Sequence, residues 1–256
     1  MDIIILIAVS FGASWLTFFC GFGLGTMLTP VFYMLFKDLE VAIAATTIVH
    51  FLNNVFKFLL MKKSVNWRIA LPFGLAAIPA AFLGAFLLTH FDDFTITTYH
   101  IFDKHWQIKA MNLVFGIILG GFALIELIPS WRLAFSKQKL WIGGVISGFF
   151  GGLSGHQGAL RTAFLVKYKL EKNVFIATGI VVALTVDIVR SSVYFSDLSK
   201  VSHINWSLVL ISLLAALIGA ISGRYFLQKI KLNTLNIIIS LAMLVFGVAL
   251  GIGLLN

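Results

Sequence analysis

Polar and ionisable residues recur at helical spacing inside two apolar stretches of the chain. In the first stretch, His50, Asn54 and Lys57 follow one another at intervals of four and three residues, so on a helix they would share one face. In the second stretch, Asp187 and Arg190 are three residues apart. Basic and amide groups bind anions, and histidine and aspartate also carry protons. These five residues therefore predict a buried pathway for an anion, with proton coupling as a second role.

Two glycine-rich runs provide the second group of candidate residues. The first run contains Gly21, Gly23 and Gly25, and the second lies between Gly151 and Gly158. Glycine at this density breaks a helix, and the helix that restarts after a break presents unpaired N–H groups and the positive end of its dipole. Two restarts of this kind predict an anion-binding site at the tips. Its predicted members are Gly23, Gly25, Thr26, Thr29, Gly155, His156, Gly158, Arg161 and Thr162.

Side chains near the tips add to this predicted anion site. Thr29 and Thr162 offer hydroxyl donors, and the planar guanidinium of Arg161 can hold an oxyanion through two hydrogen bonds. His156 would contact the anion, or its imidazole would gain and lose a proton near neutral pH. Asp187 has two interpretations: it is a proton carrier, or it is the counterion that keeps Arg161 or Arg190 charged when the site is empty.

The alternative interpretation of these residues is structural. Glycines also allow helices to pack closely in membranes, and Lys57 and Arg190 lie near enough to segment ends for their side chains to reach the headgroups. A charge at the bilayer centre costs about 2.5 to 3.5 kcal/mol, however, and residues of this kind usually serve a function. Because the two glycine breaks fall at corresponding places in the two halves of the chain, we favour the functional interpretation of the glycines. For Lys57 and Arg190 both interpretations stay open.

The elements that would position these residues are transmembrane helices. Of the 256 residues, 60% are hydrophobic and 11% are charged, whereas a soluble domain carries about 25% charged residues. The predicted fold class is therefore an all-α polytopic membrane protein. A helix needs about 20 apolar residues to span the bilayer. Eight apolar segments are found, at 3–36, 41–60, 69–88, 109–128, 140–166, 172–194, 205–227 and 232–255.

The distribution of the 19 basic residues predicts how these segments cross the membrane. If every segment crossed once, the two faces would carry 7 and 8 of the basic loop residues. If the first and fifth segments instead fold back at their glycines, one face carries 11 and the other 4. Cytoplasmic loops are enriched in lysine and arginine. We therefore expect two membrane-embedded hairpins, with both termini outside the cytoplasm.

The two halves of the chain form a repeat. A shift of 139 positions aligns 66–84 with 205–223 at 8 identities in 19. A shift of 133 aligns Gly25 with Gly158, Thr29 with Thr162, Asn54 with Asp187 and Lys57 with Arg190. With the folded-back topology, this predicts one membrane domain of two inverted four-segment repeats, 1–128 and 129–256. The first segment of each repeat is broken at a membrane-embedded tip, Gly21–Gly25 or Gly151–Gly158. Paired breaks in inverted repeats are typical of secondary transporters with a midplane site.

At these residues the chain resembles the TauE/SafE family, the sulfite exporter family. One motif is the run Gly-Phe-Gly-Leu-Gly-Thr-Met-Leu-Thr-Pro, which ends at Pro30, and the other extends from Gly148 to Gly158. The resemblance covers essentially the whole chain. It implies a bacterial-type plasma-membrane transporter of sulfite, sulfonates or other sulfur-containing anions. The chain departs from the family pattern at Thr26, His156 and Gln157, which stand where consecutive glycines are common.

The predicted function is a secondary transporter, an exporter, that moves a small anion by alternating access at a midplane site. An anion channel on the same scaffold is the alternative. An intramembrane enzyme is disfavoured, because no nucleophile, base and orienting group occur together. The sequence does not predict the oligomeric state.

Other partners and cofactors are not predicted. The net charge of +9 lies mostly in loops, and no basic stripe interleaved with aromatic residues points to nucleic acid. Cys20 is the single cysteine, which excludes a thiolate-rich metal cluster. The histidines and aspartates between His90 and His105 lack a standard ligand spacing. We expect them in a solvated loop without a metal.

Overall fold

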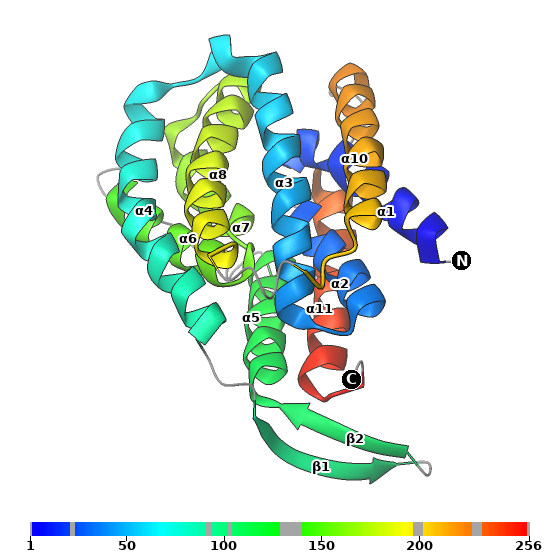
Figure 1. The fold of residues 1–256 in the computed structure, drawn as a ribbon. Coiled ribbons are helices and arrows are strands. Elements are labelled where there is room, and N and C mark those ends of the chain that lie inside the picture. The colour runs from blue at the N-terminus through cyan, green and yellow to red at the C-terminus, as the bar shows by residue number, and fades with distance from the viewer. Residues whose placement is uncertain are drawn as a thin grey trace.

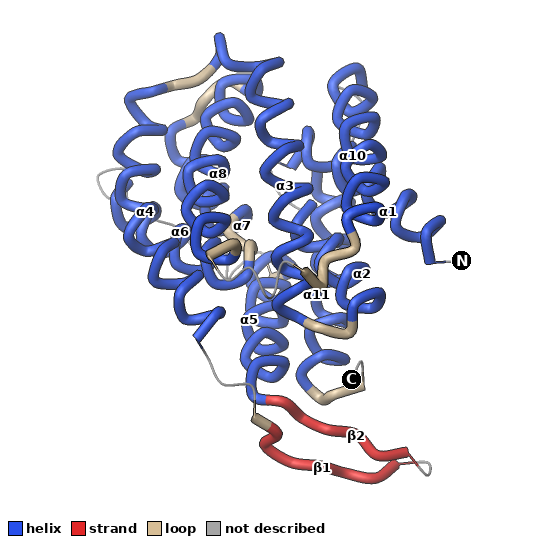
Figure 2. The backbone as a smooth tube through the Cα atoms, viewed as in Figure 1, coloured by secondary structure: helices blue, strands red, loops and turns tan. Residues whose placement is uncertain are grey.

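Helices make up nearly all of the structure, a computed structural model that describes residues 2–20, 24–90, 94–101, 104–128, 140–196, 202–226 and 232–254. Figures 1 and 2 show their arrangement as a helical bundle with one protruding pair of strands. In chain order, the longer helices are α1 (Asp2–Cys20), α2 (Leu24–Phe36), α3 (Leu39–Met61), α4 (Trp67–His90), α5 (Ala110–Leu127), α6 (Leu140–Ser154), α7 (Gly158–Leu165), α8 (Lys172–Tyr194), α10 (Trp206–Phe226) and α11 (Leu232–Gly251). Two short 3₁₀ helices, η1 (Lys62–Ser64) and η3 (Val166–Tyr168), follow α3 and α7.

The lengths and compositions of the helices fit a membrane protein. Within the described residues, four stretches are long and apolar enough to cross a membrane: Leu39–Ser64, Trp67–His90, Lys172–Tyr194 and Trp206–Tyr225. Shorter apolar helices lie within α1, α2, α5 and α6. The prediction of a polytopic helical protein is therefore confirmed, and the predicted segment 172–194 coincides with α8.

The fifth predicted segment is divided into α6 and α7, which fold back on each other at 155–157. Gly144, near the start of α6, packs against the backbone of Phe73 in α4. Phe164, near the end of α7, contacts the same Phe73, with ring centroids 6.2 Å apart. The start of α6 and the end of α7 therefore both lie beside Phe73, near the start of α4. The break is shorter than the predicted run Gly151–Gly158, because its first two glycines lie inside α6.

Two basic residues from different parts of the chain lie at the same end of the molecule. Lys62 lies in η1, between α3 and α4, at the upper end of the view in Figure 1. Lys167 lies in η3, just before α8. The segment that follows η1 contacts α8, because the N–H of Asn66 donates to Thr178 Oγ1 of α8 at 3.0 Å. The predicted crossing of the membrane by each segment stays a prediction.

The first predicted segment is also divided, into α1 and α2. The predicted site residue Gly23 falls between these helices and lies outside the described residues. The second helix begins at Leu24 and retains Pro30 in its interior.

Corresponding helices of the two halves make corresponding contacts. α1 packs against α10 as α6 packs against α4, while α3 packs against α8 and α5 against α11. Exposure also agrees between aligned positions: Leu71 and Leu210 are 52% and 56% exposed, and Ala77 and Ala216 are both 0% exposed. Small residues at the buried positions let the helix backbones approach, and the large apolar residues face outward, where lipid would cover them.

A β-hairpin takes the place of the solvated loop expected after residue 90. β1 (Thr95–Ile101) pairs antiparallel with β2 (Lys104–Lys109), with Thr95 opposite Lys109 and Ile101 opposite Lys104. Its threonine, isoleucine and aromatic residues favour strands. The all-α prediction therefore misses this pair of strands, since a search for 20-residue apolar segments does not detect short amphipathic strands. Tyr99 joins the hairpin to the end of α11 by donating its hydroxyl to the carbonyl of Ile252.

Candidate functional site

The two helix breaks meet in the interior. A Cβ atom at Gly25, in the first turn of α2, would lie 3.7 Å from the carbonyl oxygen of Gly155 in the other break. Gly155 has a φ of 78°, which L side chains rarely adopt, and a Cβ there would collide with the guanidinium of Arg190. Glycine is therefore required at 155, whereas ordinary contact distances surround position 25. The structure brings these two predicted tip residues together.

The polar faces of α3 and α8 meet beside the tips. His50 Nδ1 lies 2.7 Å from Asp187 Oδ2, and Asn54 Nδ2 donates to the same oxygen at 3.1 Å. Arg190 Nε donates to Asp187 Oδ1 at 3.0 Å, and Nη2 lies 2.8 Å from that oxygen. Asp187 is 0% and Arg190 is 1% exposed. Of the two predicted arginine partners, Asp187 therefore contacts Arg190, and Arg190 does not reach toward the headgroups.

Lys57 joins α3 to α1 rather than to the membrane surface. Its Nζ donates to Thr17 Oγ1 at 3.1 Å and to the carbonyl oxygen of Ser14 at 3.4 Å. Ser14 Oγ in turn donates to Asn53 Oδ1 at 3.1 Å. Sequence reasoning missed the residues of α1. The signal that could have found them is the spacing of Ser10, Ser14 and Thr17, which puts three hydroxyls on one face of an apolar helix.

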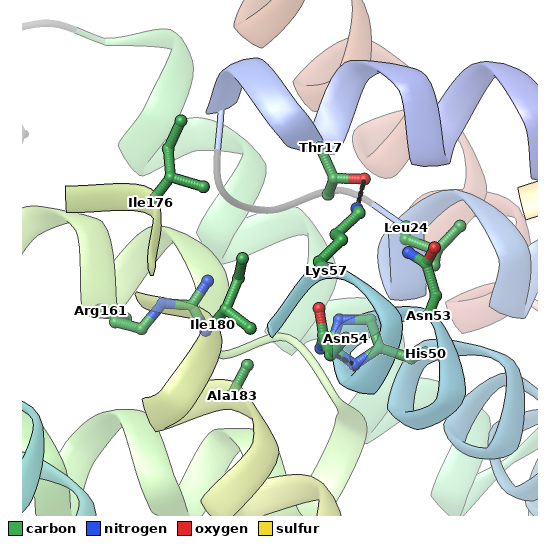
Figure 3. A pocket seen from close by; sticks show the side chains of 10 residues that line it. All are labelled: Thr17, Leu24, His50, Asn53, Asn54, Lys57, Arg161, Ile176, Ile180 and Ala183. Carbon is green, nitrogen blue, oxygen red and sulfur yellow. Dashed lines mark hydrogen bonds between the residues drawn. The ribbon is translucent and has the colours of Figure 1, made fainter. Parts of the chain in front are cut away.

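A cavity lies between these groups (Figure 3). Both halves of the chain contribute to its lining. Its polar lining consists of Thr17, His50, Asn53, Asn54, Lys57 and Arg161. Its apolar lining consists of Leu24, Ile176, Ile180 and Ala183. Among the sequence-predicted residues, the cavity thus unites His50, Asn54 and Lys57 of the first half with Arg161 of the second.

The cavity is closed around a very small volume. Its volume is about 20 Å³, on a scale where one water molecule needs about 10 to 15 Å³. A sulfite-sized or sulfonate-sized anion would enter only after the surrounding side chains or helices move. The cavity as it stands has no room for such an anion.

Basic side chains outnumber carboxylates in the interior. Among the described residues, the buried charged side chains are those of Lys57, Arg161, Asp187 and Arg190, which makes three positive charges and one negative charge. Charges removed from water are costly unless they are compensated. An anion that entered the cavity would therefore meet a favourable electrostatic environment, with Lys57 on one side and Arg161 on the other.

The tip between α6 and α7 carries buried polar side chains without hydrogen-bond partners. His156 and Gln157 are 4% and 1% exposed. Neither ring nitrogen of His156 and neither terminal atom of Gln157 has a hydrogen-bond partner in the described part of the chain. Each such buried group costs about 1 to 3 kcal/mol, and groups of this kind are candidates for a functional role. Gln157 was not among the predicted site residues.

The remaining predicted residues are not among the described residues that line the cavity. The hydroxyl of Thr29 donates to the carbonyl oxygen of Gly25 in its own helix at 2.8 Å, so its hydrogen is used within α2. Thr26 and Thr162 are partly exposed, and Gly158 is the first residue of α7. The predicted hydroxyl donors are therefore not part of the described cavity lining.

Comparison with known proteins gives one match. The family model described as sulfite exporter TauE/SafE matches residues 6–250, which include both helix breaks and every residue of the cavity. No curated protein and no solved structure matches the chain significantly. Together with the apolar helices, the family match shows that this chain is a multi-pass integral membrane protein that belongs to the TauE/SafE sulfite exporter family.

Proposed function

We propose that the protein is a secondary transporter that exports a small sulfur-containing anion across the plasma membrane by alternating access. The observation that supports this function is the cavity beside the two helix breaks, which Lys57 lines from the first half and Arg161 from the second. With three buried basic groups and one buried carboxylate among the described residues, the interior favours an anion. Family membership supports transport of sulfite or related anions.

Alternating access requires two related halves that can move against each other around a fixed site. We propose that residues 1–128 and 129–256 are inverted repeats that provide these halves. In support, α3 contacts α8 and α5 contacts α11, so counterparts pack against each other. The end of α3 also lies by the start of α8, because η1 contacts α8 while His50 contacts Asp187. The two counterpart helices α3 and α8 therefore run in opposite directions.

The cavity lining suggests the form of the anion. Lys57 and Arg161 offer charged donors to an oxyanion, and Ile176, Ile180 and Leu24 form an apolar side. A sulfonate has the matching form, because three oxygens occupy one end and a carbon substituent the other. Within the class of sulfur-containing anions, we therefore propose that small sulfonates are accepted together with sulfite.

Flux through proteoliposomes tests this function. Arg161→Ala removes the guanidinium that lines the cavity, so we expect sulfite and methanesulfonate flux to fall at least tenfold, equivalent to about 1.4 kcal/mol. Arg224→Ala, at an exposed arginine of α10, is the matched control and should leave flux unchanged. If Arg161→Ala leaves the flux of sulfite, sulfonates and carboxylates unaffected, the assignment of the site is wrong.

The same preparation separates a transporter from an anion channel. A transporter exchanges labelled for unlabelled anion across the membrane and saturates with concentration, because each cycle opens a closed site to one side at a time. A channel instead passes anions at a conductance that does not saturate in this way, and it shows no counterflow. The small volume of the cavity favours the transporter, and single-channel anion currents in planar bilayers would contradict it.

A further inference from the structure

His50 lies between the cavity and the buried carboxylate of Asp187. Its Nδ1 is 2.7 Å from Asp187 Oδ2, and the residue also lines the cavity. An ionised carboxylate oxygen only accepts hydrogen bonds, so Nδ1 carries the hydrogen and donates it. The other ring nitrogen, Nε2, then has the lone pair. It is the atom on which this imidazole can take up a proton.

Asp187 offers no comparable place for a proton. One of its oxygens accepts from Arg190 Nε at 3.0 Å, and the other accepts from Asn54 Nδ2 at 3.1 Å and contacts His50. A proton on this carboxyl group would displace one of these donors. The side chain of Asp187 is also 0% exposed, whereas that of His50 keeps 12% exposure. Geometry and access therefore both favour His50 over Asp187.

The charged and titratable groups around His50 come from several elements. Arg161 on α7 and His156 on the turn before it interact electrostatically with His50, as do Asp187 and Arg190 on α8. Lys57 on α3 lines the same cavity. The residues that α1 and α2 contribute to the cavity wall, Thr17 and Leu24, do not ionise. The groups that face His50 are thus Arg161, His156, Asp187, Arg190 and Lys57.

We infer that His50 is the proton-binding residue of this site and that the proton is bound together with the anion. In the empty site, a proton on His50 would add a fourth positive charge beside the single buried carboxylate among the described residues. A bound anion compensates this charge. Linkage then requires that the proton strengthens anion binding by the same factor as the anion strengthens proton binding. Anion and proton would therefore cross in the same direction.

This inference rests on the proposed function and assigns its coupling step to one residue. Calorimetry of methanesulfonate binding to the purified protein, in two buffers with different ionisation enthalpies, counts the protons taken up. Methanesulfonate is the probe because sulfite itself takes up a proton near neutral pH. Between about pH 6 and 8, where histidine changes charge, we expect uptake to approach one proton for each anion bound. In His50→Gln, the anion should still bind with proton uptake close to zero.

Two matched variants test Lys57 and His156 as the source of the proton uptake. Lys57→Arg keeps the positive charge but cannot lose its proton, and His156→Gln removes the other buried histidine. Whatever their affinity for methanesulfonate, both should take up as many protons per anion bound as the unmodified protein. If either variant loses the uptake while His50→Gln retains it, the assignment to His50 is overturned.

The outcomes separate this inference from the proposed function. If the unmodified protein binds methanesulfonate without proton uptake, the inference is wrong and the anion transporter stands. If methanesulfonate, sulfite and thiosulfate neither bind nor cross the membrane, both fail. Should His50→Gln not fold, retained uptake in Lys57→Arg and His156→Gln supports His50, and zero uptake in the unmodified protein refutes it.

Discussion

The two halves of the chain differ in charge at aligned positions. α3 carries Asn54 and Lys57, and α8 carries Asp187 and Arg190 at the positions aligned with them. Arg190 is paired with the carboxylate on its own helix, at 2.8 Å. Lys57 instead donates to neutral oxygens of α1. The amide in place of a second carboxylate therefore makes the excess of buried positive charge among the described residues larger by one, which would favour the proposed anion.

The two helix breaks differ as well. Gly155 combines a positive φ with the guanidinium of Arg190 at its Cα, whereas Gly25 has only ordinary contacts around it. At Gly155 a side chain is thus excluded by the backbone conformation and by Arg190. At Gly25 the surrounding distances do not exclude one, so the two tips differ in their tolerance of a side chain.

Replacement of Asp187 tests the charge difference between the halves, and we expect it to have the largest effect on stability. In Asp187→Asn the two halves carry the same amide, and Arg190 loses its buried counterion. We expect the free energy of unfolding to fall by about 3 to 5 kcal/mol, the cost of removing one partner of a buried ion pair. Thermal unfolding in detergent measures this change. Glu171→Gln, at an exposed carboxylate before α8, should change it by less than about 0.5 kcal/mol. Equal effects of both variants would contradict the role of the pair.

Alanine at the two tips tests how they differ in their tolerance of a side chain. Gly155→Ala must place a side chain in a left-handed conformation and displace Arg190, so we expect a loss of about 2 kcal/mol. Gly25→Ala meets its nearest atom at 3.7 Å and should cost less than about 1 kcal/mol. The comparison uses thermal unfolding of both variants in the same detergent. Similar losses for both would show that the tips are equivalent.

A carboxylate in α3 tests whether the charge difference serves anion binding. Asn54→Asp makes the two halves alike in charge at these aligned positions and lowers the positive excess in the interior by one. We expect the Kd for methanesulfonate to rise at least tenfold, equivalent to about 1.4 kcal/mol. Asn205→Asp, at an exposed asparagine before α10, is the control with the same change in charge. Unchanged affinity in Asn54→Asp would separate anion binding from this asymmetry.

Two aligned leucines that face outward test whether the two halves are alike in their lipid-facing surfaces. Leu71 and Leu210 are 52% and 56% exposed on surfaces that lipid would cover, and lipid is as apolar as leucine. Leu71→Ala and Leu210→Ala should each change the free energy of unfolding by less than about 0.5 kcal/mol. A larger loss at one position alone, measured by thermal unfolding, would reveal a packing partner in one half.

Much of the helical fold could be predicted from the sequence. The segment 41–60 corresponds to α3, and the glycine run in the fifth segment does contain a break. Apolar length and glycine content are local properties, so they identify such elements directly. The end of α6 could not be placed in this way, because Gly151 and Gly152 stay helical where their small size lets α6 approach neighbouring elements. The strands β1 and β2 are too short for a search at helical length.

The candidate site was predicted less completely. Lys57, Arg161, Asp187 and Arg190 stood out because charges are rare in apolar segments. Thr17 and Asn53 did not, because neutral polar residues are common in membrane helices, where they hydrogen-bond across helices. Which of them reach the cavity depends on how α1 packs against α3, and spacing within one segment does not determine that.

The amino-acid sequence by itself determined the number of apolar segments, the places where glycines break them and the inventory of charges that must be buried. These follow from local composition and from the cost of placing charge in hydrocarbon. The tertiary structure alone decided that Asp187 contacts Arg190 and His50, and that Lys57 and Arg161 line one cavity. The contacts to His50 and across the cavity join helices more than 100 positions apart, so they arise only when the two halves pack together.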